Sequence, residues 1–147
     1  MIDTQAETIV VATDRSRLDV DTIHAFLRTA YWSTGIPRDV VERAIDNSIC
    51  FGAFEGERQV GFARVITDRA TFGYVSDVFV LESHRGRGVG KLLMSAIMSH
   101  PELQGLRRWT LFTRDAHGLY RHYGFSEGRH PERLMELFNE RTYGMAV

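Results

Sequence analysis

Apolar residues recur along this chain in two spacings, one typical of strands and one typical of helices. Four runs rich in β-branched and aromatic residues have the length and composition of strands: residues 8–13, 49–54, 60–67 and 71–81. Short polar segments, 55–58 and 68–70, separate the last three runs and are typical of turns. The pattern therefore predicts one isolated strand and, later, three consecutive antiparallel strands.

Helical spacing occurs twice between the first and second of these strands. Apolar positions three or four residues apart predict helices over residues 19–28 and 37–45, and Pro37 suits the first turn of the second helix. The residues that form the two apolar faces are Val20, Ile23, Phe26 and Leu27, then Val40, Val41, Ala44 and Ile45. Tyr31, Trp32 and Ile36 form an aromatic loop in the connection, which fits a plain hydrophobic anchor.

The third antiparallel strand leads into a glycine-rich segment and then into a third helix. The segment reads Arg85-Gly86-Arg87-Gly88-Val89-Gly90, and helical spacing continues through Leu92, Leu93, Ala96 and Ile97. Pro101 ends that helix. A strand over 108–113 and a helix over 115–123 follow, whereas residues 134–138 fit either an edge strand or a helical turn.

Composition limits the classes of protein that fit this pattern. With 147 residues and 44% hydrophobic content, we expect a single domain over 1–147, with its core within about 8–137. The net charge of −1 argues against a nucleic-acid or membrane partner, and no run is long enough for a signal peptide or a membrane span. A single cysteine, Cys50, favours a reducing compartment, so we expect a cytoplasmic protein.

Histidine and cysteine spacing does not predict a metal centre. His117 and His122 are five positions apart, which places them on different sides of a helix, and the other histidines have no partner at ligand spacing. Cys50 lies in an apolar strand and fits a small core residue. We therefore expect neither a metal ion nor an acyl-cysteine route.

The glycine-rich segment has the properties of a phosphate site. A helix begins with about four N–H groups that lack intrahelical partners, and the helix dipole adds positive charge there. Glycines at 86, 88 and 90 allow a close approach of the backbone, while Arg85, Arg87 and Lys91 supply local cations. The alternative is a tight turn with solvated basic residues, but the position between strand and helix favours phosphate binding.

Two other phosphate-binding motifs fit poorly. A P-loop requires a glycine five residues before Gly90 and Ser or Thr after Lys91, and Arg85 and Leu92 occupy those positions. The dinucleotide fingerprint G-x-G-x-x-G is one residue longer than the spacing from Gly86 to Gly90. Neither class of nucleotide site is therefore favoured.

Two motifs resemble those of the GCN5-related N-acetyltransferases (GNAT). One is Arg-x-x-Gly-x-Gly over 85–90, preceded by 78–84, and the other is A-x-x-L-Y-x-x-x-G-F over 116–125. The resemblance implies an α/β (α+β) fold with a mixed, mostly antiparallel central sheet and helices on both faces. It also implies acetyl transfer from acetyl-CoA, as co-substrate, directly to the amine of a small molecule or peptide, by a monomer or homodimer.

The same resemblance assigns roles to individual residues. Backbone groups of Val78, Phe79 and Val80 would pair with the pantetheine arm of CoA, and the segment from Arg85 to Lys91, with Gly86, Arg87, Gly88, Val89 and Gly90, would hold its pyrophosphate. Tyr120 would protonate the leaving thiolate, its alternative being a packed aromatic residue. The late strand lacks the Glu and Asn that often occur there in the family, so Thr113 would take the Asn role.

The general base is less defined. In an unbroken strand, Tyr74, Ser76, Val78 and Val80 share one face, and Asp77 lies on the other unless a bulge intervenes. The family often has a polar or water-binding group at the positions of Tyr74 and Ser76, which favours a water relay, and we expect Asp77 to act as a structural hydrogen-bonding group. A non-catalytic CoA-binding module and a nucleotide-dependent phosphotransferase remain alternatives.

Overall fold

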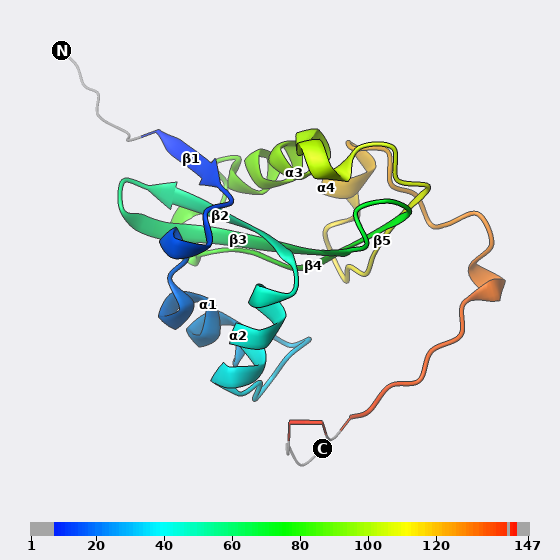
Figure 1. The fold of residues 1–147 in the computed structure, drawn as a ribbon, viewed down its shortest axis with the longest axis horizontal. Helices are drawn as coiled ribbons and strands as arrows, with labels where there is room; N and C mark the ends of the chain where they lie inside the picture. The colour runs from blue at the N-terminus through cyan, green and yellow to red at the C-terminus, as the bar shows by residue number, and fades with distance from the viewer. Residues whose placement is uncertain (1–7, 141, 144–147) are drawn as a thin grey trace.

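The computed structural model describes residues 8–140, 142 and 143, and within them a mixed five-stranded sheet lies between two layers of helices (Figure 1). The strands are β1 (Ile9–Ala12), β2 (Ile49–Glu55), β3 (Arg58–Thr67), β4 (Phe72–Val80) and β5 (Arg108–Leu111). The helices are α1 (Val20–Leu27), α2 (Arg38–Asp46), α3 (Val89–Ser99) and α4 (His117–Arg121). Short 3-10 turns are η1 (Arg15–Arg17), η2 (Glu82–His84), η3 (Pro101–Leu103) and η4 (Pro131–Arg133).

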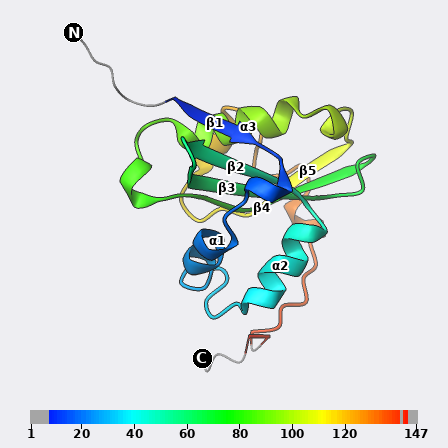
Figure 2. The same cartoon turned by 60° about the vertical axis from the view of Figure 1, so that its left-hand side comes forward.

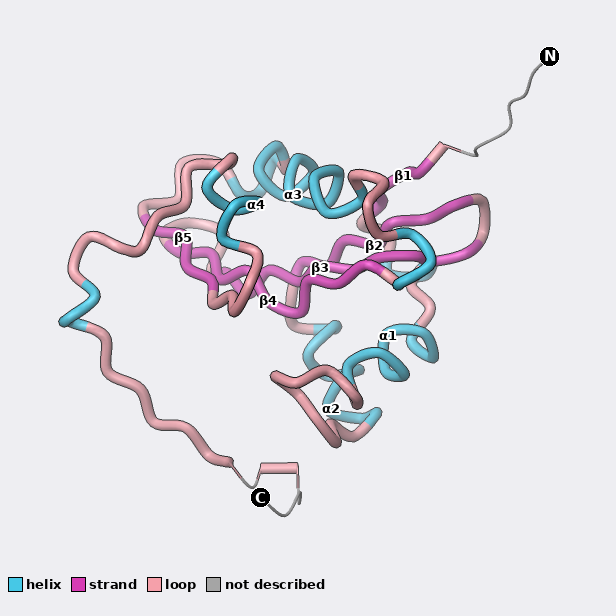
Figure 3. The backbone as a smooth tube through the Cα atoms, turned by 180° about the vertical axis from the view of Figure 1, so that it is seen from behind, coloured by secondary structure: helices cyan, strands magenta, loops and turns pink. Residues whose placement is uncertain are grey.

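The strands follow one another across the sheet in the order β1-β2-β3-β4-β5. Neighbouring strands are antiparallel except β4 and β5, which are parallel. Helices α1 and α2 cover one face of the sheet, and α3 and α4 cover the other, as Figure 2 and the reverse view in Figure 3 show. The architecture expected from the sequence is confirmed. Within the described part of the chain, no helix has both the length and the apolar character needed to span a membrane.

The hydrophobic core has two parts, one on each face of the sheet. In β2, Phe51 and Ala53 point toward α3, while Cys50 and Phe54 point toward α1 and α2. Six consecutive residues of this strand are buried because both of its faces are covered. The continuous apolar run in the sequence therefore reflects a central strand.

A bulge in β4 changes which residues share a face. Asp77 has a left-handed backbone (φ 54°), and the register passes from Phe62↔Phe79 to Arg64↔Ser76, so two residues of β4 lie opposite one residue of β3. Val78 and Val80 consequently pack with the α3-side core. The prediction that these two valines share a face with Tyr74 and Ser76 is wrong, since the inserted residue reverses the alternation.

The late elements are shorter than the sequence pattern predicts. Strand β5 ends at Leu111 instead of residue 113, and α4 covers only His117–Arg121. Residues 134–138, for which the pattern allowed a strand or a helical turn, form neither and run extended and exposed. Helix α2 begins at Arg38, with Pro37 as its N-cap residue.

Candidate active site

Strands β4 and β5 separate halfway along their length. They pair only from Phe72↔Arg108 to Val75↔Leu111, so the second half of β4 has no strand neighbour on its β5 side. The Leu81 amide donates to Val60 on β3 (2.8 Å), and by alternation the backbone groups of Val78 and Val80 face the open side. A short, unpaired strand edge therefore lies beside β5.

Phe79 has a different position from its two neighbours. Its ring is buried and stacks on Phe26 of α1 with centroids 4.0 Å apart, and its backbone pairs with Phe62 of β3. Phe79 thus fixes this half of β4 against α1, and Val78 and Val80 are the residues that can offer backbone groups to an extended ligand. The Val80 carbonyl already accepts a hydrogen bond from Nε of Arg85 (3.1 Å).

The open edge leads into the glycine-rich segment and the first turn of α3. Gly86 (φ 78°) and Gly88 (φ 79°) have left-handed backbones, and a Cβ added to either would meet no atom within 4 Å. Glycine is required at these positions by conformation and not by crowding. Gly88 is the N-cap residue of α3 and has no side-chain cap, so the first amides of the helix remain available to an anion.

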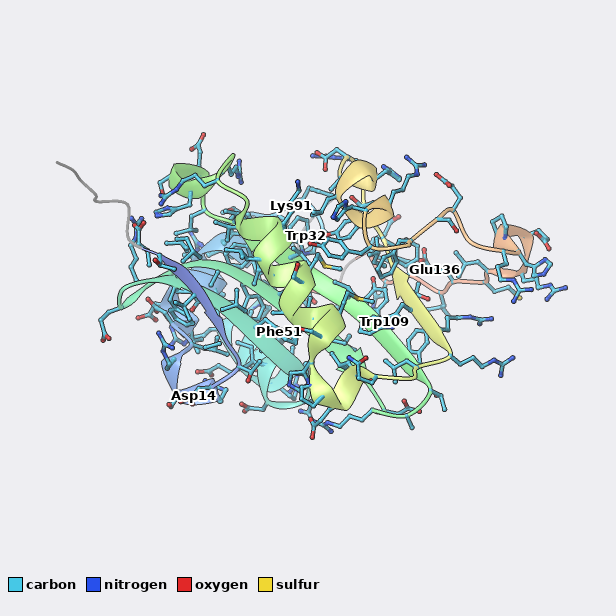
Figure 4. All side chains as sticks on the ribbon, turned by 90° about the horizontal axis from the view of Figure 1, so that it is seen from above. Asp14, Trp32, Phe51, Lys91, Trp109 and Glu136 are labelled. Carbon is cyan, nitrogen blue, oxygen red and sulfur yellow. The ribbon has the colours of Figure 1, made fainter. Side chains whose placement is uncertain are left out.

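The rest of this segment anchors α3. Val89 is buried in the core, and Gly90 lies next to α4, where an added Cβ would be 3.5 Å from a methyl group of Leu119. Lys91 stands in the first turn of α3, labelled in Figure 4, and its carbonyl accepts a hydrogen bond from the Tyr123 hydroxyl (2.9 Å). The segment therefore joins the glycine-rich loop to both α3 and α4.

An ion pair holds Arg87 next to the sheet. Arg87 donates to Oε2 of Glu55 (3.0 Å), and Nε2 of His84 lies 3.0 Å from Oε1 of the same carboxylate. These two hydrogen bonds, from His84 first and Arg87 second, lower the pKa of Glu55. The buried His84 also contacts the Ser83 hydroxyl (2.7 Å), so the loop before α3 is fixed at several points.

Tyr120 lines a cavity of about 290 Å³ between β5 and the segment after α4, together with Leu111, Phe112, Thr113, His117, Arg121, Phe125, Ser126 and Glu127. Its side chain is only 8% exposed, and burial, with smaller contributions from Tyr31 and Asp115, raises its pKa. Its hydroxyl has no hydrogen-bond partner among the described residues and is not fully enclosed. Tyr120 therefore offers a protonated phenol to this space at neutral pH.

Thr113 has a structural contact that its predicted role did not anticipate. Its hydroxyl oxygen accepts a hydrogen bond from the Ala116 amide (2.9 Å) and thereby holds the start of α4. The hydroxyl hydrogen remains available as a donor. Thr113 can therefore position α4 and still contact a ligand.

A buried ion pair lies at the β4 bulge. Asp77 accepts a hydrogen bond from Nε of Arg64 (2.9 Å) through one carboxylate oxygen and from Nε1 of Trp32 (2.8 Å) through the other. The Asp77 and Arg64 side chains are only 9% and 14% exposed. Both oxygens of Asp77 are engaged, which agrees with the structural role expected for it. The bulge brings its carboxylate to the same side of the sheet as Arg64.

The two candidate relay groups lie close to this ion pair. Arg64 also donates to the Ser76 hydroxyl (3.4 Å) and to Ser48 (3.1 Å). Tyr74 is half-buried and packs edge to face with Phe112 (centroids 6.1 Å apart). Burial first, then Asp77 and Glu136, raise the pKa of Tyr74. Neither residue is a strong base in this setting.

Sequence reasoning missed the roles of Arg64 and Arg114. Arg64 interrupts an apolar strand, and a charged residue there signals a buried partner, although the sequence does not identify Asp77 as that partner. The guanidinium of Arg114 lies 3.9 Å from the centre of the Tyr31 ring, and no pattern in the sequence predicts this contact. Of the connection between α1 and α2, Ile36 is buried, whereas Tyr31 and Trp32 reach the site.

Cys50 is not part of this site. Cys50 is buried in the core, and burial raises its pKa to about 12, so it is not a nucleophile. The residues from 8 to 140, with 142 and 143, contain no cluster of three or more His, Cys, Asp or Glu side chains that could hold a metal ion.

Comparison with known proteins agrees with this geometry. Residues 46–127, just over half of the chain, match the model of the acetyltransferase (GNAT) domain. A candidate acetyltransferase of Gibberella zeae is 35% identical over 134 residues, covering 76% of this chain and 75% of the relative. The fold and the sequence are therefore those of the acetyltransferase class. The chain belongs to the GNAT family.

Solved structures show the same fold. The crystal structure of a candidate GNAT acetyltransferase from Xanthomonas campestris pv. campestris is 52% identical, with a TM-score of 0.91 over 96% of this chain and 100% of that one. A candidate acetyltransferase from Clostridium acetobutylicum, solved with acetyl-CoA, is 13% identical with a TM-score of 0.66, covering 89% and 96% of the two chains. The second likeness bears on the fold alone.

Proposed function

We propose that this chain transfers an acetyl group from acetyl-CoA directly to the amine of a small-molecule or peptide acceptor. One observation carries the proposal: the open edge of β4 at Val78 and Val80 leads, through η2 and the glycine-rich segment, to the uncapped first turn of α3. An extended amide-containing arm that ends in a pyrophosphate matches this sequence of backbone groups. The Clostridium protein, which has the same fold, was solved with acetyl-CoA.

In the proposed binding mode, both backbone groups and side chains contact the cofactor. Val78 and Val80 pair with the pantetheine arm, and the amides from Gly88 to Lys91 take the pyrophosphate, with Arg85, Arg87 and Lys91 as nearby cations. Arg87 is already paired with Glu55, so its contribution is smaller than that of an unpaired arginine. Thr113 donates its hydroxyl hydrogen to the pantetheine arm of CoA, near the thioester.

Acetyl transfer requires proton transfer away from the amine and proton transfer to the leaving sulfur. An amine with a pKa near ~10.4 must first lose a proton, and water held near Ser76 and Tyr74 carries it to solvent because Asp77 is fully engaged. The amine nitrogen then bonds to the acetyl carbon and gives up a second proton to the same water, the carbon–sulfur bond breaks, and Tyr120 donates its proton to the sulfur. Solvent returns a proton to Tyr120.

The direct test measures thiol release from acetyl-CoA with a panel of amines, amino acids, aminoglycosides and peptides, alongside CoA binding by thermal shift. Turnover with any acceptor, together with CoA binding, would support the proposal. Binding without turnover would favour a non-catalytic CoA-binding module. Stabilisation by ATP and magnesium without stabilisation by CoA would favour a phosphotransferase.

We also propose a cytoplasmic location. The single, buried Cys50 supports it, because such a chain needs no oxidising compartment to fold. Fractionation of cells that express the protein would test this, and recovery from a secreted or membrane fraction would contradict it.

A further inference from the structure

A second cavity, also of about 290 Å³, lies at the end of the sheet where β2 begins. Residues of η1, the end of α2, the start of β2, the β3–β4 turn and η3 line it, and it shares none of them with the cavity of Tyr120. His100, in its wall, follows the last turn of α3, whereas Gly88 precedes the first. The 11 residues of α3, at a rise of about 1.5 Å each, put roughly 16 Å between this cavity and the glycine-rich segment.

Buried apolar side chains form the floor of this second cavity. Leu18, Ile45 and Cys50 belong to the core under α1 and α2, and Ile49 belongs to the core under α3. The floor therefore spans the end of the sheet, where the two parts of the core meet. A ligand with an apolar group gains free energy by covering such a floor.

Two ion pairs form the rim of the second cavity, one on each side of the sheet. Nε of Arg15 lies 3.0 Å from Oδ1 of Asp46, and Nε of Arg69 lies 3.1 Å from Oε1 of Glu102. The four side chains are between 49% and 60% exposed, and ion pairs this exposed contribute little to stability, so a ligand can share their charges. Two positive and two negative charges match a ligand that carries one charge of each sign.

His100 adds a hydrogen-bond donor to the rim. Its Nδ1 accepts a hydrogen bond from the Glu102 amide (3.1 Å), so the neutral ring carries its hydrogen on Nε2. The ring packs edge to face against Phe51, with centroids 5.6 Å apart. No other residue of the ranges that the structure describes makes a hydrogen bond to Nε2, and this N–H group can therefore donate to a carboxylate.

The β3–β4 turn holds Arg69 in a backbone conformation that non-glycine residues rarely adopt. Its φ is 62°, in the left-handed region. Asp68 fixes the turn, because its Oδ1 accepts hydrogen bonds from the amides of Ala70 (2.9 Å) and Thr71 (2.7 Å). Arg69 thus enters the rim from a fixed backbone, which reduces the entropy that a ligand must remove on binding.

We propose that this second cavity binds a free amino acid with an apolar side chain. The carboxylate of the ligand accepts hydrogen bonds from Arg69 and His100, its ammonium group donates to Asp46, and its side chain covers the floor. A cavity of about 150 Å³ holds a benzene ring, so about 290 Å³ has room for an amino acid of the size of leucine. This inference does not depend on acetyl transfer and applies equally to a chain that only binds CoA.

NMR titration of the isotope-labelled chain with leucine, isoleucine and phenylalanine tests the proposal, because the shifted amides locate the ligand. At least one of the three is expected to give saturable shifts at residues 45–50, 68–71 and 100–102, with a Kd below about 10 mM. Its amide, which lacks the carboxylate, and its N-acetyl derivative, which lacks the ammonium group, should bind at least about 10-fold more weakly. Shifts confined to residues 111–127, no saturable binding, or equal binding of the two derivatives would overturn the proposal.

Two cavity variants and one control complete the experiment. Arg69→Gly removes the guanidinium and suits the left-handed turn, and Asp46→Asn removes the carboxylate that receives the ammonium group. Both are expected to raise the Kd for the amino acid at least about 10-fold. Arg38→Ala breaks exposed ion pairs with Asp21 and Glu42 outside the cavity and should leave the Kd unchanged. A wild-type Kd in both cavity variants, or an equal loss of affinity in Arg38→Ala, would overturn the proposal.

Discussion

Burial determines which of the site's side chains can serve as acid or base. Tyr120 is almost fully buried, and the resulting rise in its pKa keeps the phenol protonated across the neutral range. Asp77 is the nearest carboxylate to the β4 bulge, but Arg64 and Trp32 engage both of its oxygens. Tyr120 is therefore the candidate proton donor, and water near Ser76 and Tyr74 is the proposed route for the amine proton.

Replacement of Tyr120 tests the acid role. Tyr120→Phe is expected to lower kcat by at least about 100-fold while the Kd for CoA changes little, because proton donation contributes roughly 10²–10⁴-fold to such steps. Steady-state kinetics at saturating acetyl-CoA measure the effect. Tyr123→Phe is the matched control, since Tyr123 bonds the Lys91 carbonyl and lies on the same segment. Equal kcat values in Tyr120→Phe and the wild type would contradict the role of Tyr120 as general acid.

The ion pairs of Glu55, which lie beside the glycine-rich segment, are expected to make the stability of the fold depend on pH. The pKa of Glu55 is lowered from an ordinary value near 4.5, so its ion pairs stabilise the fold fully above that value, and this stabilisation is lost as pH falls through the lowered pKa. The denaturant midpoint of Glu55→Gln is expected to lie below that of wild type at pH 7, and the gap should close toward pH 3. A gap that is constant between pH 7 and pH 3 would contradict this role.

Among the elements, β4 does most to create the site. Its first half pairs with β5, and the bulge at Asp77 turns its second half so that Val78 and Val80 present backbone groups to the open side. The Arg64–Asp77 ion pair and Phe79, stacked on Phe26, fix this geometry from the α1 side. The bulge therefore links the packing of α1 to the shape of the open β4 edge, which is the proposed binding site for the pantetheine arm.

Removal of the charge at the bulge should destabilise the protein strongly. Asp77→Asn keeps the left-handed backbone accessible but leaves Arg64 buried without a counter-charge, and the expected loss is about 3 kcal/mol in the free energy of unfolding. Glu102→Gln breaks the exposed Arg69–Glu102 pair, with both side chains 56% exposed, and should cost less than about 1 kcal/mol. Urea unfolding measures both. Similar losses in the free energy of unfolding of the two variants would show that the Arg64–Asp77 pair stabilises the fold no more than an exposed ion pair does.

For the whole molecule, apolar periodicity and turn residues predicted the helices, the three consecutive antiparallel strands and the strand-to-helix position of the glycines, because the chain encodes these features locally. The mixed sheet with helices on both faces was implied by the resemblance to the GNAT family. The sequence could not predict the reversed faces of Val78 and Val80, since the bulge depends on a contact between Asp77 and Arg64 thirteen residues away. The extended course of residues 134–138 was not predicted either, because their pattern fits an edge strand or a helical turn and the structure shows neither.

The first turn of α3 is the proposed pyrophosphate site, and calorimetric titration of CoA into two glycine variants tests this role most directly. Gly88 (φ 79°) and Gly105 (φ 75°) have the same left-handed backbone and open surroundings, so Gly88→Val and Gly105→Val impose a similar strain of about 1–2 kcal/mol. Gly105 lies beyond the other end of α3, between η3 and β5. We predict a Kd for CoA at least about 10-fold higher in Gly88→Val, or about 1.4 kcal/mol, and a wild-type Kd in Gly105→Val. An unchanged Kd in folded Gly88→Val would contradict the account.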